Sequence, residues 1–191
     1  MIRETVVTTQ DRAGVVHVAP IGLIEDGEHL VIAPFRPSRT LDNLRENPFA
    51  VANYTDDVRV FAGCLTGRRV WSTRPATKVA GAVLDGALAH AELAVVDVAE
   101  DAARPRFRCA VVHEATHAPF RGFNRAQAAV VEAAILVSRL HMLPFDQIER
   151  ETAYLRIAID KTAGPREREA WGWLMEKIAA HRAAAPVEPG A

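Results

Sequence analysis

The spacing of apolar residues changes near residue 120, and this change constrains the fold more than any other feature. Before it, strand-forming runs such as ETVVTTQ and VVHVAPIGL are separated by turn signals. After it, apolar residues recur at helical spacing, as at Ala126, Ala129 and Val130. The pattern predicts a mainly β body, residues 1–120, with a helical C-terminal layer, residues 121–182, in an α+β fold.

The β body begins with two expected hairpins. DRAG separates the first two strand runs, and Asp26-Gly27 is a turn signal inside IEDGEHLVIAPF. Further strands are expected at FAVANYT, DGALAHAELAVVDVAED and RPRFRCAVVHEA. The stretch DVRVFAGCL is either another strand or the entry to the next segment.

Four helices are expected, one of them inside the β body. RTLDNLRENP has Leu41 and Leu44 three apart, with Ser38 or Thr40 as the cap and Pro48 as the stop. NRAQAAVVEAAILVSRLHML begins with Asn124, a candidate N-cap, and FDQIERETAYLRIAIDK and REREAWGWLMEKIAAHRA complete the helical layer. The tail, residues 183–191, is expected to be disordered.

Composition narrows the class of protein. The chain has 191 residues and a net charge of −1, so nothing indicates broad binding to nucleic acid or an anionic membrane. No apolar run is long enough to span a bilayer, and the N-terminus lacks a secretory signal. Cys64 and Cys109 are far apart and are expected to be reduced thiols. These features predict a cytoplasmic protein.

The stretch His113-Glu114-Ala115-Thr116-His117 matches the HExxH pattern of zinc proteases. A working motif lies in a helix, where both imidazoles share one face. Here the preceding residues alternate like a strand, and Pro119 would interrupt a helix. The stretch is therefore interpreted as a strand end entering a loop, with no metal site predicted, and a zinc hydrolase is kept as the less favoured alternative.

A second stretch, RPSRT, combines groups that bind a phosphomonoester. Arg36 and Arg39 supply positive charge, Ser38 and Thr40 supply hydroxyls, and a helix is expected to start directly after them. A polar loop that merely caps the helix is the alternative. Polar groups of Asn53, Thr55 and Asp56 follow a buried strand and can face a planar heterocycle, and Pro20 and Gly22 allow close backbone approach.

The chain resembles the domain-of-unknown-function 447 family, within the flavin-reductase-like FMN-binding split barrels. The resemblance rests on ETVVTT, VAPIG, PFRPSRTLDNL, NYTDDVRVF and FNRAQAAVVEAAILVSRL, in this order, and spans residues 2 to about 180. It implies an FMN-binding split β-barrel of six strands and a homodimer with FMN near the interface. It also implies a possible link to tetrahydromethanopterin-dependent one-carbon metabolism.

The resemblance also implies residues that bind the cofactor. Arg36, Ser38, Arg39 and Thr40 would hold the phosphate. The residues that would border the isoalloxazine are Ala19, Ile21, Gly22, Asn53, Thr55 and Val58. Asn124 and Arg125, with Glu132 and Arg139 on the following helix, would complete the site or the interface.

The reaction is left open by the sequence. The leading hypothesis is an FMN-dependent oxidoreductase with an unknown small-molecule substrate, and the alternative is a non-catalytic flavin-binding or accessory protein. No proton-transfer group, electron donor or catalytic residue is identified. Cys109 is expected to be a buried, inert thiol, and Trp171 and Trp173 are expected to pack the last helix.

Overall fold

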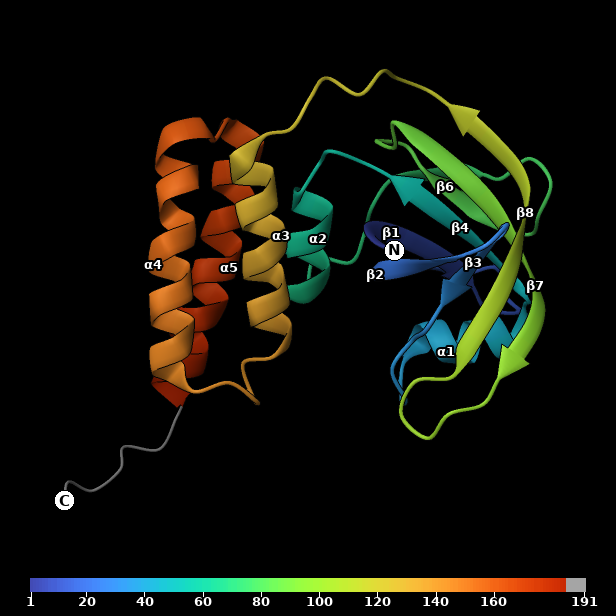
Figure 1. Cartoon of the computed structure of the whole chain (residues 1–191), viewed down its shortest axis with the longest axis horizontal. Coiled ribbons are helices and arrows are strands. Elements are labelled where there is room, and N and C mark those ends of the chain that lie inside the picture. The colour runs from blue at the N-terminus through green and yellow to red at the C-terminus, as the bar shows by residue number, and fades with distance from the viewer. Residues whose placement is uncertain (185–191) are drawn as a thin grey trace. The chain divides into compact units, whose positions relative to one another are not determined.

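The computed structural model describes residues 1–184, and the chain forms two compact units, each considered by itself (Figure 1). The first unit contains residues 1–56 and 69–121, and the second contains residues 57–68 and the residues from 122 on. The sequence pattern predicts residues 57–68 as part of the first unit. The predicted domain division itself stays a prediction.

A closed β-barrel forms the first unit. Its strands are hydrogen-bonded in the order β1-β2-β3-β8-β7-β4, and the neighbouring pairs β1–β2, β3–β8 and β7–β8 are antiparallel. The strands are β1 (Ile2–Gln10), β2 (Val16–Asp26), β3 (His29–Ile32), β4 (Phe49–Tyr54), β7 (Ala89–Ala99) and β8 (Arg106–Thr116). The predicted strands and the α+β fold class are confirmed.

The two N-terminal hairpins form where their turn residues predict them. Gly14 has φ 80° between β1 and β2, and Gly27 has φ 62° between β2 and β3. These left-handed conformations cost glycine nothing, whereas a side chain would strain them. The pairing of Asp26 with His29 follows directly from the Asp26-Gly27 turn.

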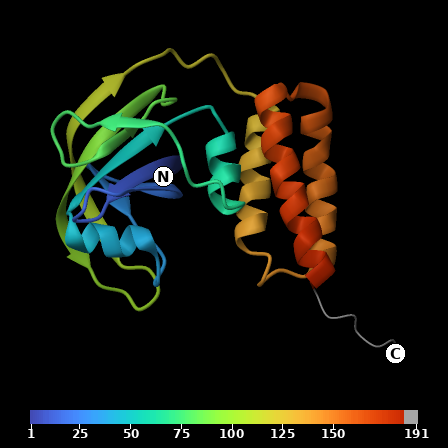
Figure 2. The same ribbon diagram turned by 180° about the vertical axis from the view of Figure 1, so that it is seen from behind.

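The barrel interior is filled from alternate positions on each strand. Val7, Ala52, Ala91 and Phe107 are at most 1% exposed and belong to one apolar core. Helix α1 (Arg39–Glu46) contributes Leu41 and Leu44 to this core. It lies across one end of the barrel, as Figure 1 and the reverse view in Figure 2 both show.

A short hairpin covers part of the barrel's outer wall. It consists of β5 (Thr73–Pro75) and β6 (Ala82–Leu84). Thr8 donates a hydrogen bond from its hydroxyl to the Ala82 carbonyl, and the Leu84 N–H donates to Asn53 Oδ1 at 2.8 Å. The hairpin therefore explains why Thr8 and Asn53, which alternate with core residues, are buried polar groups.

The second unit is helical. It contains α2 (Arg59–Leu65), α3 (Arg125–Ser138), α4 (Phe145–Thr162) and α5 (Pro165–Ala184). Asn124 caps α3 by accepting hydrogen bonds from Ala126 N and Gln127 N, as predicted. The packing prediction for the last helix is confirmed at Trp171, which is 7% exposed.

The strand option for DVRVFAGCL is wrong, because these residues form α2. Val60, Phe61, Ala62 and Gly63 are buried in succession, and α2 packs against α3 and α5. A short apolar run has no periodicity that separates a strand from a buried helix. Tertiary packing decided the conformation here.

Three further expectations concern the tail, the membrane and Cys109. Residues 183 and 184 belong to α5, and residues 185–191 of the predicted tail lie outside the described residues.

In the part of the chain that the structure describes, no helix is both long and apolar enough to cross a membrane. Cys109 is fully buried, and burial raises the pKa of its thiol to about 12, so the prediction of an inert thiol is confirmed.

Candidate functional site

The predicted phosphate-binding residues gather at the start of α1. Ser38 is the N-cap and accepts a hydrogen bond from Leu41 N at 3.3 Å, while Asp42 N donates to the Ser38 carbonyl. This pattern leaves the N–H groups of Arg39 and Thr40 without an acceptor inside the helix. The start of α1 therefore combines two backbone donors with the positive end of a helix.

Two arginines, Arg36 and Arg39, lie on either side of the cap residue Ser38 in the sequence. Arg36 Nη2 lies 3.0 Å from Glu100 Oε2, and Arg39 Nη2 lies 3.6 Å from Asp11 Oδ2. The side chains of Arg36 and Arg39 are 37% and 49% exposed, so both ion pairs are accessible to solvent. Each exposed ion pair contributes no more than about 1 kcal/mol to stability. An anion of higher charge, such as a phosphate, can therefore replace the carboxylate in either pair.

The predicted β2 residues lie on a barrel strand. Ala19 pairs with Val7, and Ile21 packs against the barrel core. A Cβ atom on Gly22 would lie 2.8 Å from Ile2 Cγ2 and 3.4 Å from Glu4 Oε1. The small size of Gly22 is therefore explained by packing against β1, and its role beside a ligand stays a prediction.

Asn53 and Thr55 occupy structural positions around β4. Asn53 is fully buried, and its Nδ2 donates to the carbonyls of Val6 at 3.0 Å and Val51 at 3.1 Å. Thr55 donates from its hydroxyl to the Gly86 carbonyl at 3.0 Å. These bonds attach the barrel wall to the neighbouring segments, and contact with a heterocycle stays a prediction for both residues.

The remaining predicted residues belong to the helical unit. Val58 is the buried N-cap residue of α2, and Asn124 and Arg125 form the start of α3. Asn124 Nδ2 also donates to the Thr162 carbonyl at 3.2 Å, which ties α3 to the end of α4. Arg139 is the C-cap of α3.

The HExxH stretch is not helical. Strand β8 ends at Thr116, so His113 lies within the strand and His117 follows directly after it, as the sequence analysis interpreted. Alternation along the strand cannot place the two imidazoles as an i, i+4 helical pair does. The zinc-protease arrangement is therefore absent from this stretch.

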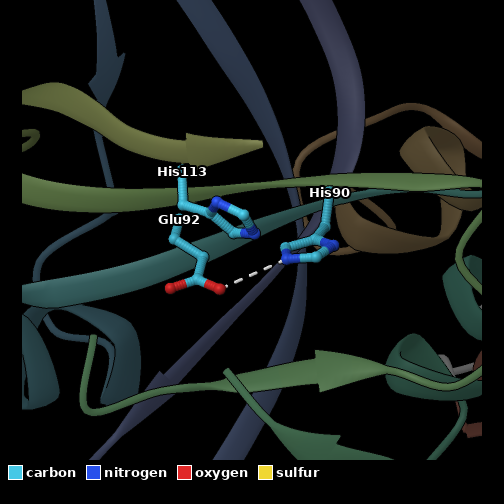
Figure 3. A group of neighbouring side chains, drawn as sticks. All are labelled: His90, Glu92 and His113. Carbon is cyan, nitrogen blue, oxygen red and sulfur yellow. Dashed lines mark hydrogen bonds and ion pairs between the residues drawn. The ribbon is translucent and has the colours of Figure 1, made fainter. Parts of the chain in front are cut away.

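Both histidines nevertheless join a group that the sequence analysis missed, here termed the histidine cluster: His90, Glu92, His113 and His117. His90 and Glu92 lie two residues apart on β7, and Glu92 pairs directly with His113 of β8. His90 Nε2 lies 3.4 Å from Glu92 Oε1, and its ring centroid lies 5.9 Å from that of His113 (Figure 3).

The cluster is held by a network of hydrogen bonds. Glu92 is fully buried and accepts from the backbone N–H groups of Thr77 and Lys78, each at 2.6 Å, and of Val79 at 3.0 Å. Burial raises the pKa of the Glu92 carboxyl. The hydrogen bonds from Thr77, Lys78, His90 and Val79 outweigh burial, so the pKa lies below its ordinary value.

His117 extends this network toward the surface. Its Nε2 lies 2.8 Å from His90 Nδ1 and 2.8 Å from Arg74 Nη2, and its ring stacks on His90 with centroids 5.0 Å apart. Burial lowers the pKa of His117, and the charges of Arg74 and His90 lower it further. The imidazole of His117 is therefore mainly neutral at pH 7.

One sequence signal pointed to the cluster. In AHAEL the spacing of His90 and Glu92 places both side chains on one face of a strand. The pairing of Glu92 with His113 depends on the register between β7 and β8, which is irregular at Glu92/Leu93. A one-residue shift would have moved His113 to the opposite face, so sequence alone could not assemble the cluster.

A surface pocket of the barrel lies elsewhere and contains none of the predicted site residues. Its lining consists of Asp26, Val31, Asp97, Ala99, Arg106 and Arg108. The start of α1 and the histidine cluster are therefore distinguished by their chemistry rather than by a deep cavity.

Comparison with solved structures identifies the class of fold. An FMN-bound protein of family DUF447 from Methanosarcina mazei superposes with a TM-score of 0.80 at 17% identity, over 92% of this chain and 94% of that chain. An NADH:FAD oxidoreductase from Streptomyces globisporus gives a TM-score of 0.52 at 13% identity, over 64% of this chain and 81% of that chain. A Shewanella frigidimarina protein with a split barrel domain superposes with a TM-score of 0.53 at 13% identity. The match covers 61% of this chain and 68% of that chain.

The barrel therefore has the split-barrel fold. Family comparison then places the chain within this class. The N-terminal domain of the protein family of unknown function DUF447 matches residues 3–118, and its C-terminal domain matches residues 124–176. The chain belongs to the DUF447 family. Comparison with curated proteins finds no match.

Proposed function

We propose that this chain binds FMN and acts as an oxidoreductase of the flavin-reductase-like split-barrel type. The observation that carries the proposal is the donor set around the start of α1, which comprises Arg36, Ser38, Arg39 and Thr40. The FMN-bound Methanosarcina mazei protein and the Streptomyces globisporus oxidoreductase support it as proteins of similar fold.

The residues present fit the phosphate of FMN. A phosphate monoester carries nearly two negative charges and three acceptor oxygens at neutral pH, so it requires several donors and positive charge. Arg36 and Arg39 provide the charge, and the N–H groups of Arg39 and Thr40 provide backbone donors. The Ser38 hydroxyl accepts from Leu41 N, and its own proton remains available for an acceptor oxygen.

FMN, when bound, would supply the hydride and electron transfer. The chain would contribute anchoring and orientation. Arg36 and Arg39 would hold the phosphate by charge, while the Ser38 cap keeps the first turn of α1 in position. Ile21, on a barrel strand packed against the core, would offer an apolar surface of fixed position to the ring.

The homodimer belongs to the same proposal. Strands β7 and β8 carry four valines that are 36–50% exposed: Val96, Val98, Val111 and Val112. Apolar side chains gathered on neighbouring strands favour contact with another protein surface. A mass measurement by light scattering during gel filtration would give twice the chain mass of 20.9 kDa for the dimer. The link to tetrahydromethanopterin-dependent metabolism rests on the family resemblance alone and stays a prediction.

The experiment that tests FMN binding uses the protein as purified. Absorption bands near those of oxidised flavin, together with FMN identified by mass spectrometry after denaturation, are expected. Oxidation of NADH or NADPH with an electron acceptor would then distinguish an oxidoreductase from a non-catalytic flavin-binding protein. A colourless protein that fails to bind added FMN would exclude both.

A further inference from the structure

We propose that His90, Glu92 and His113 form a binding site for one first-row divalent transition-metal ion, for which Zn²⁺ is the experimental probe. One ligand atom from each of the three side chains lies within 4.8 Å of the other two. Two imidazoles and one carboxylate are a ligand set that suits zinc and its neighbours in the first row. The proposal does not depend on FMN binding.

The separation of His90 and Glu92 fits a shared ion. Zinc bonds of about 2.0–2.2 Å in tetrahedral geometry place two ligand atoms roughly 3.3–3.6 Å apart. His90 Nε2 and Glu92 Oε1 are 3.4 Å apart, which is long for a charge-assisted hydrogen bond. The distance therefore matches two ligands of one ion better than a direct strong hydrogen bond.

The strand register supplies the third ligand. Glu92 and His113 are cross-strand partners on β7 and β8, and His90 lies on the same face as Glu92. His90 and Glu92 are 3% and 0% exposed, whereas His113 is only partly buried. The side chains converge from two strands in Figure 3, and the partly exposed His113 gives the ion a route from solvent.

His117 and Arg74 orient the His90 ring. A guanidinium only donates hydrogen bonds, so His117 Nε2 acts as the acceptor for Arg74 at 2.8 Å. His90 Nδ1 lies 2.8 Å from the same nitrogen, so His117 contacts both Arg74 and His90. The contact with His117 orients the His90 ring so that Nε2 faces Glu92, as an outer-shell partner does for a metal-binding histidine.

Glu92 is fixed with comparable precision. Three backbone N–H groups of residues 77–79 hold its carboxylate at 2.6–3.0 Å. A positive charge beside a fully buried carboxylate offsets part of the cost of its burial. A metal ion held by His90, Glu92 and His113 would supply this charge.

The test measures zinc binding by the full chain after dialysis against a chelator. Competition with a chromophoric chelator should give about one Zn²⁺ per chain, and bound Zn²⁺ should raise the melting temperature. His113→Ala is the informative variant because His113 is partly exposed and its loss leaves the Glu92 hydrogen bonds in place. We expect at least a roughly 100-fold loss of zinc affinity, at or above the upper end of outer-shell effects.

Matched variants distinguish zinc binding at His90, Glu92 and His113 from zinc binding by the HExxH stretch and from adventitious zinc binding elsewhere on the protein. Glu114→Gln, within the motif but outside the proposed ligand set, and His141→Ala, in the helical unit, should both bind zinc like the original chain. His90→Ala should lose binding, although HExxH assigns it no role. Folding of each variant is checked by circular dichroism. Less than about one tenth of a zinc ion per chain, or unchanged affinity in folded His113→Ala, would overturn the proposal.

Discussion

The carboxylate of Glu100 lies 3.0 Å from Arg36 Nη2 and also pairs with Arg45 at 2.9 Å. Glu100 therefore competes for one of the two arginines that the proposed phosphate site requires. Its side chain is 63% exposed, so the pair with Arg36 contributes only about 0.5–1 kcal/mol.

Glu100→Gln should consequently strengthen FMN binding. Removal of the competing charge releases Arg36 toward the phosphate, and about 0.5–1 kcal/mol corresponds to roughly two- to fivefold in the dissociation constant. Fluorescence titration of FMN at low ionic strength measures the change. Glu28→Gln, which removes an exposed carboxylate at the β2–β3 turn, is the control and should leave the affinity unchanged.

Ser38→Ala should lower the free energy of unfolding by about 1 kcal/mol, because Leu41 N loses its capping acceptor. Ser38→Gly should cost only a few tenths of a kcal/mol, since glycine is tolerated at an N-cap. Urea unfolding monitored by circular dichroism compares the two. Equal stability of Ser38→Ala and the original chain would show that the cap does not stabilise α1.

Asn53→Ala should destabilise the barrel by about 3 kcal/mol. The substitution leaves the Leu84 N–H and the carbonyls of Val6 and Val51 without their side-chain partner in a fully buried position. Urea unfolding again provides the measurement. A cost below about 1 kcal/mol would mean that the bonds between β4 and its neighbours contribute little.

Asp57→Asn should remove a pH-dependent part of the stability. Burial raises the pKa of Asp57, but the hydrogen bonds and charge of Arg59, with the charge of Arg166, outweigh it, so the folded pKa lies below the ordinary value. A depressed carboxyl pKa stabilises the fold above the unfolded-state value of about 3.9, and this contribution disappears as pH falls through the folded value.

The difference between the original chain and Asp57→Asn is therefore expected to be about 1–2 kcal/mol at pH 7 and to shrink below about pH 4. Thermal unfolding from pH 3 to pH 7 measures it. Asp26→Asn, at the exposed β2–β3 turn, is a control without this ion pair. A difference that stays constant over the whole pH range would contradict the assigned ion pair.

Most of the barrel could be predicted because its signals are local. Asp26-Gly27 defines a hairpin, and Asn124 marks the start of α3, through chemistry within a few residues. The same holds for Ser38 at α1. The α2 segment could not be assigned, since its buried run from Val60 to Gly63 obtains its conformation from packing on α3 and α5.

The site residues also divide into those indicated by neighbouring residues in the sequence and those brought together only by the fold. The arginines around Ser38 could be proposed as a phosphate site because they are neighbours in sequence. His90 and His113 are 23 positions apart and meet only through the register of β7 and β8, which contains irregularities. Asn53 shows what sequence alone does not reveal, since its polar side chain is hydrogen-bonded to Val6 and Leu84, while its predicted contact with a ligand stays a prediction.

The most direct test of the central claim compares FMN with riboflavin, which has the same ring and lacks the phosphate. If the start of α1 binds the phosphate, FMN should bind at least about tenfold more tightly than riboflavin in isothermal titration. The combined substitution Arg36→Ala and Arg39→Ala should reduce this preference to less than about twofold. Equal affinity of the original chain for FMN and riboflavin, or a preference that survives the double substitution, would contradict the account.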